Sequence, residues 1–220
     1  MNSEVAILDY GVGNLHSVSR ACKKFSNNVR IVNRPEDLSS ATHLIFPGVG
    51  TFGVAMNEII DRGLKEAIFG HIGAGKFVLG ICVGMQIFAR RGTENGLHEG
   101  LGLMDAEAIE IDQFVGSKTV QKPNMGWSEI EVIDDTKSNR LLKGTASGES
   151  VYFAHSFALN IAGAGSVTSK VTIGSTEIPA SVEINNIFGV QFHPEKSGEV
   201  GLRIIKKFIE LGIEECPEKF

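Results

Sequence analysis

A cysteine stands between two glycines in the segment VLGICVGMQIF, residues 78–88. GICVG, residues 80–84, has the layout of a nucleophile elbow, a sharp strand-to-helix turn, with cysteine where hydrolases carry serine. Such a turn holds the side chain above a sheet, and the positive end of the following helix favours the thiolate. Cys82 is therefore a candidate nucleophile, and the backbone N–H of Val83 is a candidate oxyanion donor. For this motif alone, a cysteine buried for packing is the alternative.

A base for this cysteine can come from GVQFHPEKSG, residues 189–198. His193 and Glu195 are two residues apart, so in an extended segment both side chains project to the same side. The carboxylate can then fix the tautomer of the imidazole while the imidazole faces the thiol. Taken singly, these residues could be a strand-end histidine and a solvated or helix-terminal carboxylate. Together with the elbow they predict a triad of Cys82, His193 and Glu195.

A third segment, FPGVGTF (residues 46–52), follows a predicted buried strand. Gly48 and Gly50 flank Val49 and let the backbone present N–H groups at close range, which an oxyanion hole requires. We expect Val49, Gly50 and Val83 to form that hole, although a turn selected only for its shape would read the same way. The turn DYGVGN (residues 9–14) does not continue as a dinucleotide fingerprint, because His16 stands where the third glycine belongs, so a nicotinamide cofactor is not expected. No other motif predicts a cofactor.

Composition narrows the class of protein. The 220 residues include 26 acidic and 21 basic ones, for a net charge of −5, and the basic residues are dispersed. This pattern argues against nucleic acid or a membrane surface as the main partner. The three cysteines lie far apart, with no histidine at ligand spacing, so neither a disulfide framework nor a metal site is expected. No apolar run approaches the roughly 20 residues of a membrane span, which predicts a cytoplasmic protein.

The elements that must position these residues alternate in the first half. The apolar runs VAILDY (5–10), HLIFPG (43–48) and KFVLG (76–80) read as strands, with helices expected at about 14–25 and 52–69. Strands this uniformly apolar are typical of sheets covered on both faces, so we expect an α/β fold with an open, mostly parallel twisted sheet. Ligands bind at the carboxyl ends of such strands.

The second half is richer in strands. AEAIEID, WSEIEVID, ESVYFAHSFAL, SKVTI, IPASVEINN and IFGVQFHP each read as one strand and predict an antiparallel or mixed β extension of the sheet. A closing helix is expected after Ser197 as N-cap, with a stop at Gly212. Its apolar stripe comprises Leu202, Ile205, Phe208 and Ile209. Since no repeat or linker interrupts the chain, we expect one domain over residues 1–220.

The segments GICVGMQ, PGVGTF and GVQFHPEKSG resemble those of class I, triad-type glutamine amidotransferases. ILDYGVGNLHSV, PNMGWS and YFAHSF are similar, more narrowly, to the glutaminase subunits of imidazole glycerol phosphate synthase, in histidine biosynthesis. The resemblance covers nearly the whole chain. It implies that Cys82 attacks the side-chain amide of L-glutamine, that His193 gives a proton to the departing ammonia, and that Glu195 orients His193.

The same resemblance implies roles for further residues. Glutamine would be held by Gly48, Gly50, Val83 and Gln86, and its amino-acid end by His155, Ser156 and Phe157. The ammonia would cross to a (β/α)8-barrel cyclase subunit, the partner in a heterodimer, which makes imidazole glycerol phosphate and aminoimidazole carboxamide ribotide. Residues expected at that interface are Asn14, Met125, Trp127, Tyr152 and Lys196.

Four positions depart from the family pattern. Asn124 and Ser128 stand in PNMGWS where PHMGWN is usual, Phe157 replaces a tyrosine, and Val83 replaces a leucine. These changes leave a second reading open, in which a paralogous glutaminase subunit feeds a different synthase, such as a sugar-modifying amidotransferase. A freestanding γ-glutamyl hydrolase and a binding module without turnover are further alternatives.

Overall fold

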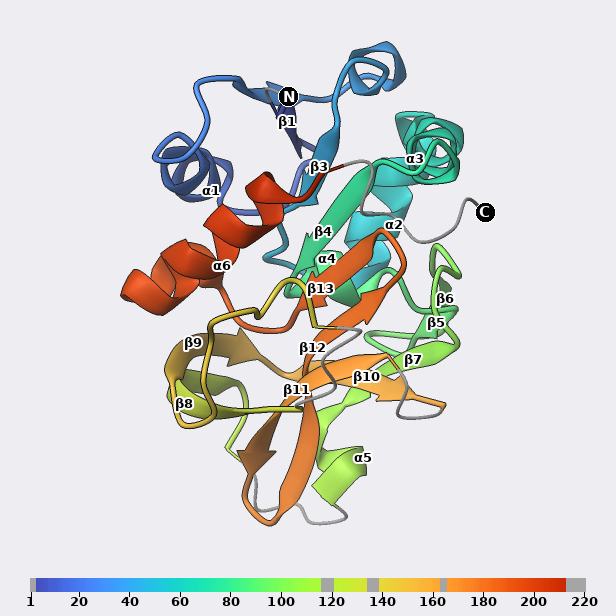
Figure 1. Cartoon of the computed structure of the whole chain (residues 1–220). Coiled ribbons are helices and arrows are strands. Elements are labelled where there is room, and N and C mark those ends of the chain that lie inside the picture. The colour runs from blue at the N-terminus through green and yellow to red at the C-terminus, as the bar shows by residue number, and fades with distance from the viewer. Residues whose placement is uncertain (1–2, 116–120, 134–138, 163–165, 213–220) are drawn as a thin grey trace.

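The computed structural model describes residues 3–115, 121–133, 139–162 and 166–212. Its main sheet has nine strands in the order β2-β1-β3-β4-β13-β12-β11-β8-β9 (Figure 1). The first five strands in that order run parallel. They are β2 (Val29–Val32), β1 (Val5–Leu8), β3 (His43–Phe46), β4 (Phe77–Ile81) and β13 (Ile187–Val190). The doubly wound parallel sheet predicted for the first half is confirmed.

The remaining four strands of this sheet pair antiparallel, which confirms the predicted β extension. They are β12 (Thr176–Ile184), β11 (Val167–Ile173), β8 (Asn124–Val132) and β9 (Ser150–His155). A second sheet has the order β10-β7-β5-β6. Its strands are β10 (Phe157–Ile161), β7 (Ala106–Glu110), β5 (Arg91–Gly92) and β6 (His98–Glu99).

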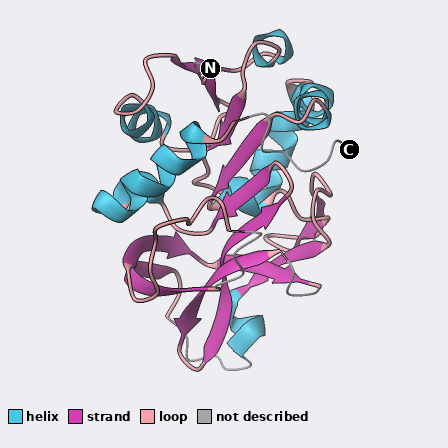
Figure 2. Cartoon of the chain, in the orientation of Figure 1, coloured by secondary structure: helices cyan, strands magenta, loops and turns pink. Residues whose placement is uncertain are grey.

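Helices cover the parallel strands on both sides (Figures 1 and 2). α1 (Leu15–Cys22) packs on α6 (Gly198–Glu210), and α2 (Phe52–Asp61) packs on α3 (Leu64–Gly73). Shorter helical segments are η1 (Pro35–Leu38), α4 (Val83–Gln86), α5 (Ile111–Val115) and η2 (Pro194–Lys196). No helix in the described ranges is long and apolar enough to span a bilayer.

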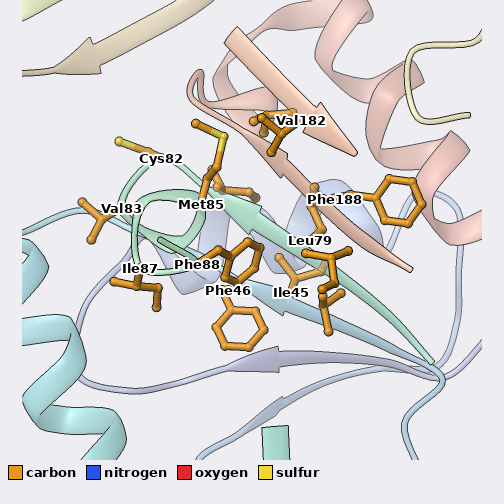
Figure 3. Packing of buried hydrophobic residues seen from close by; sticks show 14 of the residues in the cluster. Ile45, Phe46, Leu79, Cys82, Val83, Met85, Ile87, Phe88, Val182 and Phe188 are labelled. Carbon is orange, nitrogen blue, oxygen red and sulfur yellow. The ribbon is translucent and has the colours of Figure 1, made fainter. Parts of the chain in front are cut away.

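The core lies between these layers because β1, β3, β4 and β13 are buried along their whole length. Figure 3 shows it near the end of β4, where Phe46 and Phe88 meet edge to face with ring centroids 5.4 Å apart. Cys82 lies at the margin of this cluster, away from Phe188. The apolar core therefore forms a rigid base directly beneath the candidate nucleophile.

The structure differs from the sequence prediction in three elements. The helix expected over 52–69 is two helices, because Gly63 adopts a left-handed conformation (φ 62°) that ends α2. ESVYFAHSFAL is not one strand but two, β9 and β10, which separate at Ser156 and join different sheets. Ser197 is the N-cap residue of α6, as predicted, but its side chain makes no capping hydrogen bond and its hydroxyl instead donates to the carbonyl of His193 (2.6 Å).

Candidate active site

The turn at Cys82 is a strained elbow between β4 and α4. Its φ of 54° and ψ of −112° are rare for a residue with a side chain, and such strain persists only where surrounding bonds hold it. Here the N–H of Cys82 donates to the carbonyl of Val190 in β13 (2.8 Å). Its carbonyl accepts from the N–H groups of Met85 (3.0 Å) and Gln86 (3.1 Å). Backbone hydrogen bonds therefore hold the peptide groups on both sides of Cys82, and they fix the position of its sulfur.

The glycines of this segment are required by close backbone approach. A Cβ on Gly84 would lie 2.1 Å from the carbonyl oxygen of Phe46, and one on Gly80 would lie 2.5 Å from the carbonyl oxygen of Gly84. A Cβ on Gly48 would lie 2.4 Å from the backbone nitrogen of Gly84. The glycine spacing in GICVG and FPGVG therefore lets the end of β3 pack directly on the elbow.

His193 and Glu195 follow the end of β13, the parallel strand beside β4, and Glu195 lies in η2. Nδ1 of His193 is 3.0 Å from Oε1 of Glu195, and both side chains are almost completely buried. Nε2 of His193 has no hydrogen-bond partner among the described residues. Burial alone would lower the pKa of His193, but its interactions with Cys82 and Glu195 outweigh burial and raise the pKa from 6.5 to about 9. The imidazolium is thus favoured beside the thiol.

The sulfur borders a cavity of about 170 Å³. Among the residues predicted from the sequence to hold glutamine or its oxyanion, those that line it are Val49, Gly50, Val83, Gln86, His155, Ser156 and Phe157. Gly48 is not in the lining, because it packs behind the others on the elbow. Val83 opens α4, so its backbone N–H has no acceptor within that helix.

Glu94 also lines this cavity, although no sequence motif predicts it there. It lies between β5 and β6, and its Oε2 accepts a hydrogen bond from the N–H of Phe52 (2.8 Å), the first residue of α2. A Cβ on Gly53 would fall 2.6 Å from the ring of His98, so the β5–β6 segment sits tightly on α2. Only this tertiary packing brings the carboxylate to the cavity.

His155 is held neutral and fixed in orientation. Nδ1 lies 2.9 Å from the carbonyl oxygen of Phe157, so Nδ1 carries the proton, and Nε2 accepts from Nδ2 of Asn124 (3.2 Å). Burial lowers the pKa of His155 to about 4. Asn124, one of the departures from the family pattern, therefore serves as a hydrogen-bond donor to a residue of the cavity wall.

The predicted interface residues Met125, Trp127, Tyr152 and Lys196 form a patch that we call the aromatic rim. Met125 and Trp127 on β8 are 64% and 57% exposed. The ring of Trp127 contacts that of Tyr152 edge to face (6.1 Å), and Nζ of Lys196 lies 5.7 Å from the centre of the Tyr152 ring. Met125 pairs in register with Ala154, which lines the cavity, so the rim adjoins the cavity wall.

Asn14, the fifth residue predicted at the interface, has a local structural role. It is the N-cap of α1, and its side-chain oxygen accepts from the N–H of Ser17 (3.3 Å). α1 in turn contacts η2, the segment that follows His193. The N-terminal turn is thus built against the loop that carries the imidazole.

The fold and this site define a class of protein. Residues 6–211 match the family "Glutamine amidotransferase class-I", and the chain belongs to that family. Three relatives are named imidazole glycerol phosphate synthase subunit HisH. That of Legionella pneumophila (strain Lens, HisH 1) is 39% identical over 95% of this chain and 100% of its own. That of Wolinella succinogenes is 39% identical (94% and 100%), and that of Archaeoglobus fulgidus 38% identical (94% and 98%).

Solved structures agree on the fold. A crystal structure of a glutamine amidotransferase superposes with a TM-score of 0.72 at 18% identity, covering 95% of this chain and 100% of the other. The structure of PurLQS from Thermotoga maritima gives a TM-score of 0.71 at 19% identity, covering 94% and 98%. At this level of identity the likeness concerns the architecture alone.

Proposed function

We propose that this chain is the glutaminase subunit of an imidazole glycerol phosphate synthase, a single domain over residues 1–220 that works in the cytoplasm. The observation that carries the proposal is the buried hydrogen bond between His193 and Glu195. It lies beside the thiol of Cys82, which a strained turn holds at the edge of a cavity. The relatives of 38–39% identity that bear this name support the choice of synthase.

The chemistry is hydrolysis of L-glutamine in two steps. The Cys82 thiolate attacks the side-chain amide carbon, and the resulting oxyanion is stabilised by the N–H of Val83 and by N–H groups of the Val49–Gly50 backbone. The proton on His193 passes to the amide nitrogen, the C–N bond breaks, and ammonia leaves a glutamyl thioester. Water then attacks the thioester carbon while His193 accepts its proton, the C–S bond breaks, and glutamate is released with the thiol restored.

The cavity lining supplies groups for the amino-acid end of the substrate. The side chains and backbone of Gln86, His155, Ser156 and Phe157 would hold glutamine, and Glu94 would pair with its α-ammonium. Because Oε2 of Glu94 accepts a hydrogen bond from the N–H of Phe52, the carboxylate is oriented before the substrate binds. Charge pairing in this partly enclosed site selects an amino acid over a simple amide.

The aromatic rim is the proposed docking surface for a (β/α)8-barrel cyclase subunit in a heterodimer. Exposed aromatic and methionine side chains beside a positive charge are typical anchors of protein interfaces. Their place next to the cavity wall would let ammonia pass to the cyclase without escaping to solvent. There it would react with the phosphoribulosyl aminoimidazole carboxamide substrate.

The test is a glutamine hydrolysis assay with and without the cyclase subunit and its ligand. We expect slow turnover by the chain alone and strong stimulation in the complex. In the Cys82→Ala complex, synthesis from glutamine should stop while synthesis from added ammonia continues. Equal turnover with and without the cyclase would refute the coupling. Recovery of an ATP-dependent synthetase as the binding partner would favour the paralogous subunit of a different synthase.

A further inference from the structure

A buried amide side chain that does not belong to the triad contacts the sulfur of Cys82. Gln191 is completely buried two residues before His193, and its Nε2 lies 3.6 Å from Sγ of Cys82. Its Oε1 accepts from Nε2 of Gln86 (3.2 Å). The two residues that meet at the sulfur are 109 positions apart in the chain, so this contact depends on the pairing of β13 with β4.

The orientation of both amides follows from one carbonyl. The backbone oxygen of Phe157 can only accept a hydrogen bond, and it lies 2.8 Å from Nε2 of Gln86, so Gln86 must turn its NH₂ group toward it. The second N–H of that group meets Gln191, which must therefore present its oxygen to Gln86. As a result, Gln191 has only its NH₂ group left to face the sulfur.

We propose that Gln191 is a positioning residue that holds the sulfur of Cys82 in place and donates a hydrogen bond to its thiolate. The catalytic consequence rests on the proposed glutaminase function. Sγ also has a weak contact with the carbonyl oxygen of Ala154 at 3.8 Å, which can accept the S–H hydrogen of the thiol. When the proton leaves, that carbonyl no longer has a hydrogen to accept, whereas the Gln191 N–H stabilises the negative sulfur.

Five ionisable groups surround the sulfur. His193 interacts with Cys82 from the segment after β13, Glu195 is hydrogen-bonded to Nδ1 of His193, and Glu94 and His155 lie in the cavity wall. Tyr10, which interacts electrostatically with Cys82, donates its hydroxyl to the carbonyl of Pro47 (2.7 Å), and burial raises its pKa so that it stays neutral. Since Gln191 carries no charge, an uncharged replacement of similar size removes the N–H donor without adding a charge beside these groups.

The experiment measures how fast iodoacetamide alkylates Cys82 as a function of pH, with the full chain and mass spectrometry of the peptide that contains Cys82. This reaction needs no glutamine and no partner. Gln191→Met should shift the rising part of the profile to higher pH by about one pH unit. At neutral pH this shift corresponds to roughly 10-fold slower alkylation, which is the size of effect expected for the loss of one hydrogen bond to a charged group. Gln191→Glu keeps the bond to Gln86 but adds a negative charge, so its shift should be larger.

The matched control is Asn186→Leu. Asn186 is also completely buried, in the turn between β12 and β13, and its Nδ2 donates to the carbonyls of Ile72 (2.9 Å) and Lys76 (2.6 Å). It should lower the Tm and leave the alkylation profile in place. In the glutaminase assay, Gln191→Met should lower kcat more than it changes KM.

Two results would overturn the proposal: a wild-type alkylation profile in Gln191→Met, or an equal shift in the Asn186 control. If Gln191→Met does not fold, Gln191→Leu, which is also uncharged and has no N–H donor, takes its place, because the charge of Gln191→Glu would shift the profile even without a hydrogen bond from Gln191. A shifted profile in a chain that never hydrolyses glutamine would support the role of Gln191 and refute only the proposed function.

Discussion

The elbow makes a quantitative prediction for Gly84→Ala. The new methyl group would lie 2.1 Å from the carbonyl oxygen of Phe46 and 2.9 Å from its carbonyl carbon. Both atoms belong to the backbone at the end of β3, so no side-chain rotation can relieve the overlap. The elbow and β3 would have to separate by more than an ångström to restore ordinary contact, which begins near 3.4 Å.

That displacement has two measurable costs. Overpacking of a well-packed core costs about 1–3 kcal/mol, which corresponds to a fall in Tm of roughly 3–10 °C for a chain of this size. The sulfur would also move relative to the imidazole, and a displacement of about 1 Å typically costs about 10²-fold in rate. We therefore expect moderately lower stability together with a loss of most glutaminase activity.

The matched control is Gly70→Ala in α3. A Cβ there meets nothing within 4 Å, so alanine should stabilise the helix by about 0.5–1 kcal/mol and leave turnover unchanged. Thermal unfolding and glutamine hydrolysis, measured in the complex, give both quantities for both variants. If Gly84→Ala matched the wild type in Tm and in rate, the close approach of β3 to the elbow would not be what positions the thiol.

Three further predictions concern other parts of the molecule. Burial lowers the pKa of His43 from 6.5 to about 4. As the pH falls below about 6.5, His43 therefore becomes protonated in the unfolded chain before it does in the folded one, and the free energy of unfolding decreases. The part of this loss that is due to His43 should be about 2 kcal/mol between pH 7 and pH 5, measured by urea unfolding as the difference between the wild type and a His43→Gln variant, and a variant whose pH dependence is equally steep would contradict it. Glu183→Gln should lower the free energy of unfolding by about 3 kcal/mol, because Glu183 is buried and pairs with Arg140 at 2.7 Å. The control Glu177→Gln, at an exposed ion pair with Lys170, should change it by less than 1 kcal/mol. Trp127→Ala should leave the Tm nearly unchanged but weaken the stimulation by the cyclase subunit, measured by titration, and undiminished stimulation would exclude the rim from the interface.

The predictable part of the site was the part encoded by local spacing. The glycines around Cys82 fix a geometry within a few residues, and the structure contains that turn. His193 and Glu195 meet as predicted, but Glu195 lies in the 3-10 segment η2 and not in the extended segment that the two-residue interval suggested. Gln191 lies two positions before His193 in the same segment. Its contact with the sulfur also requires the pairing of β13 with β4, which brings the two distant segments together.

The remainder depends on contacts between distant segments. Glu94 reaches the cavity only because the β5–β6 segment packs on α2, and no sequence pattern specifies that packing. The division of YFAHSF between two sheets at Ser156 was missed because β9 and β10 have continuous strand character. The edge strand β2 was also missed, since only Val32 of its residues is buried and its pattern is weakly apolar.

The pairing of β13 with β4 has a consequence for folding. Cys82 is more than one hundred residues before the segment that holds Gln191 and His193. The long loop between them must therefore close before glutamine can be hydrolysed. A chain emerging from the ribosome would carry Cys82 for many seconds before its base is synthesised. The nascent protein therefore cannot release ammonia prematurely, and the onset of activity reports that the central strands have come together.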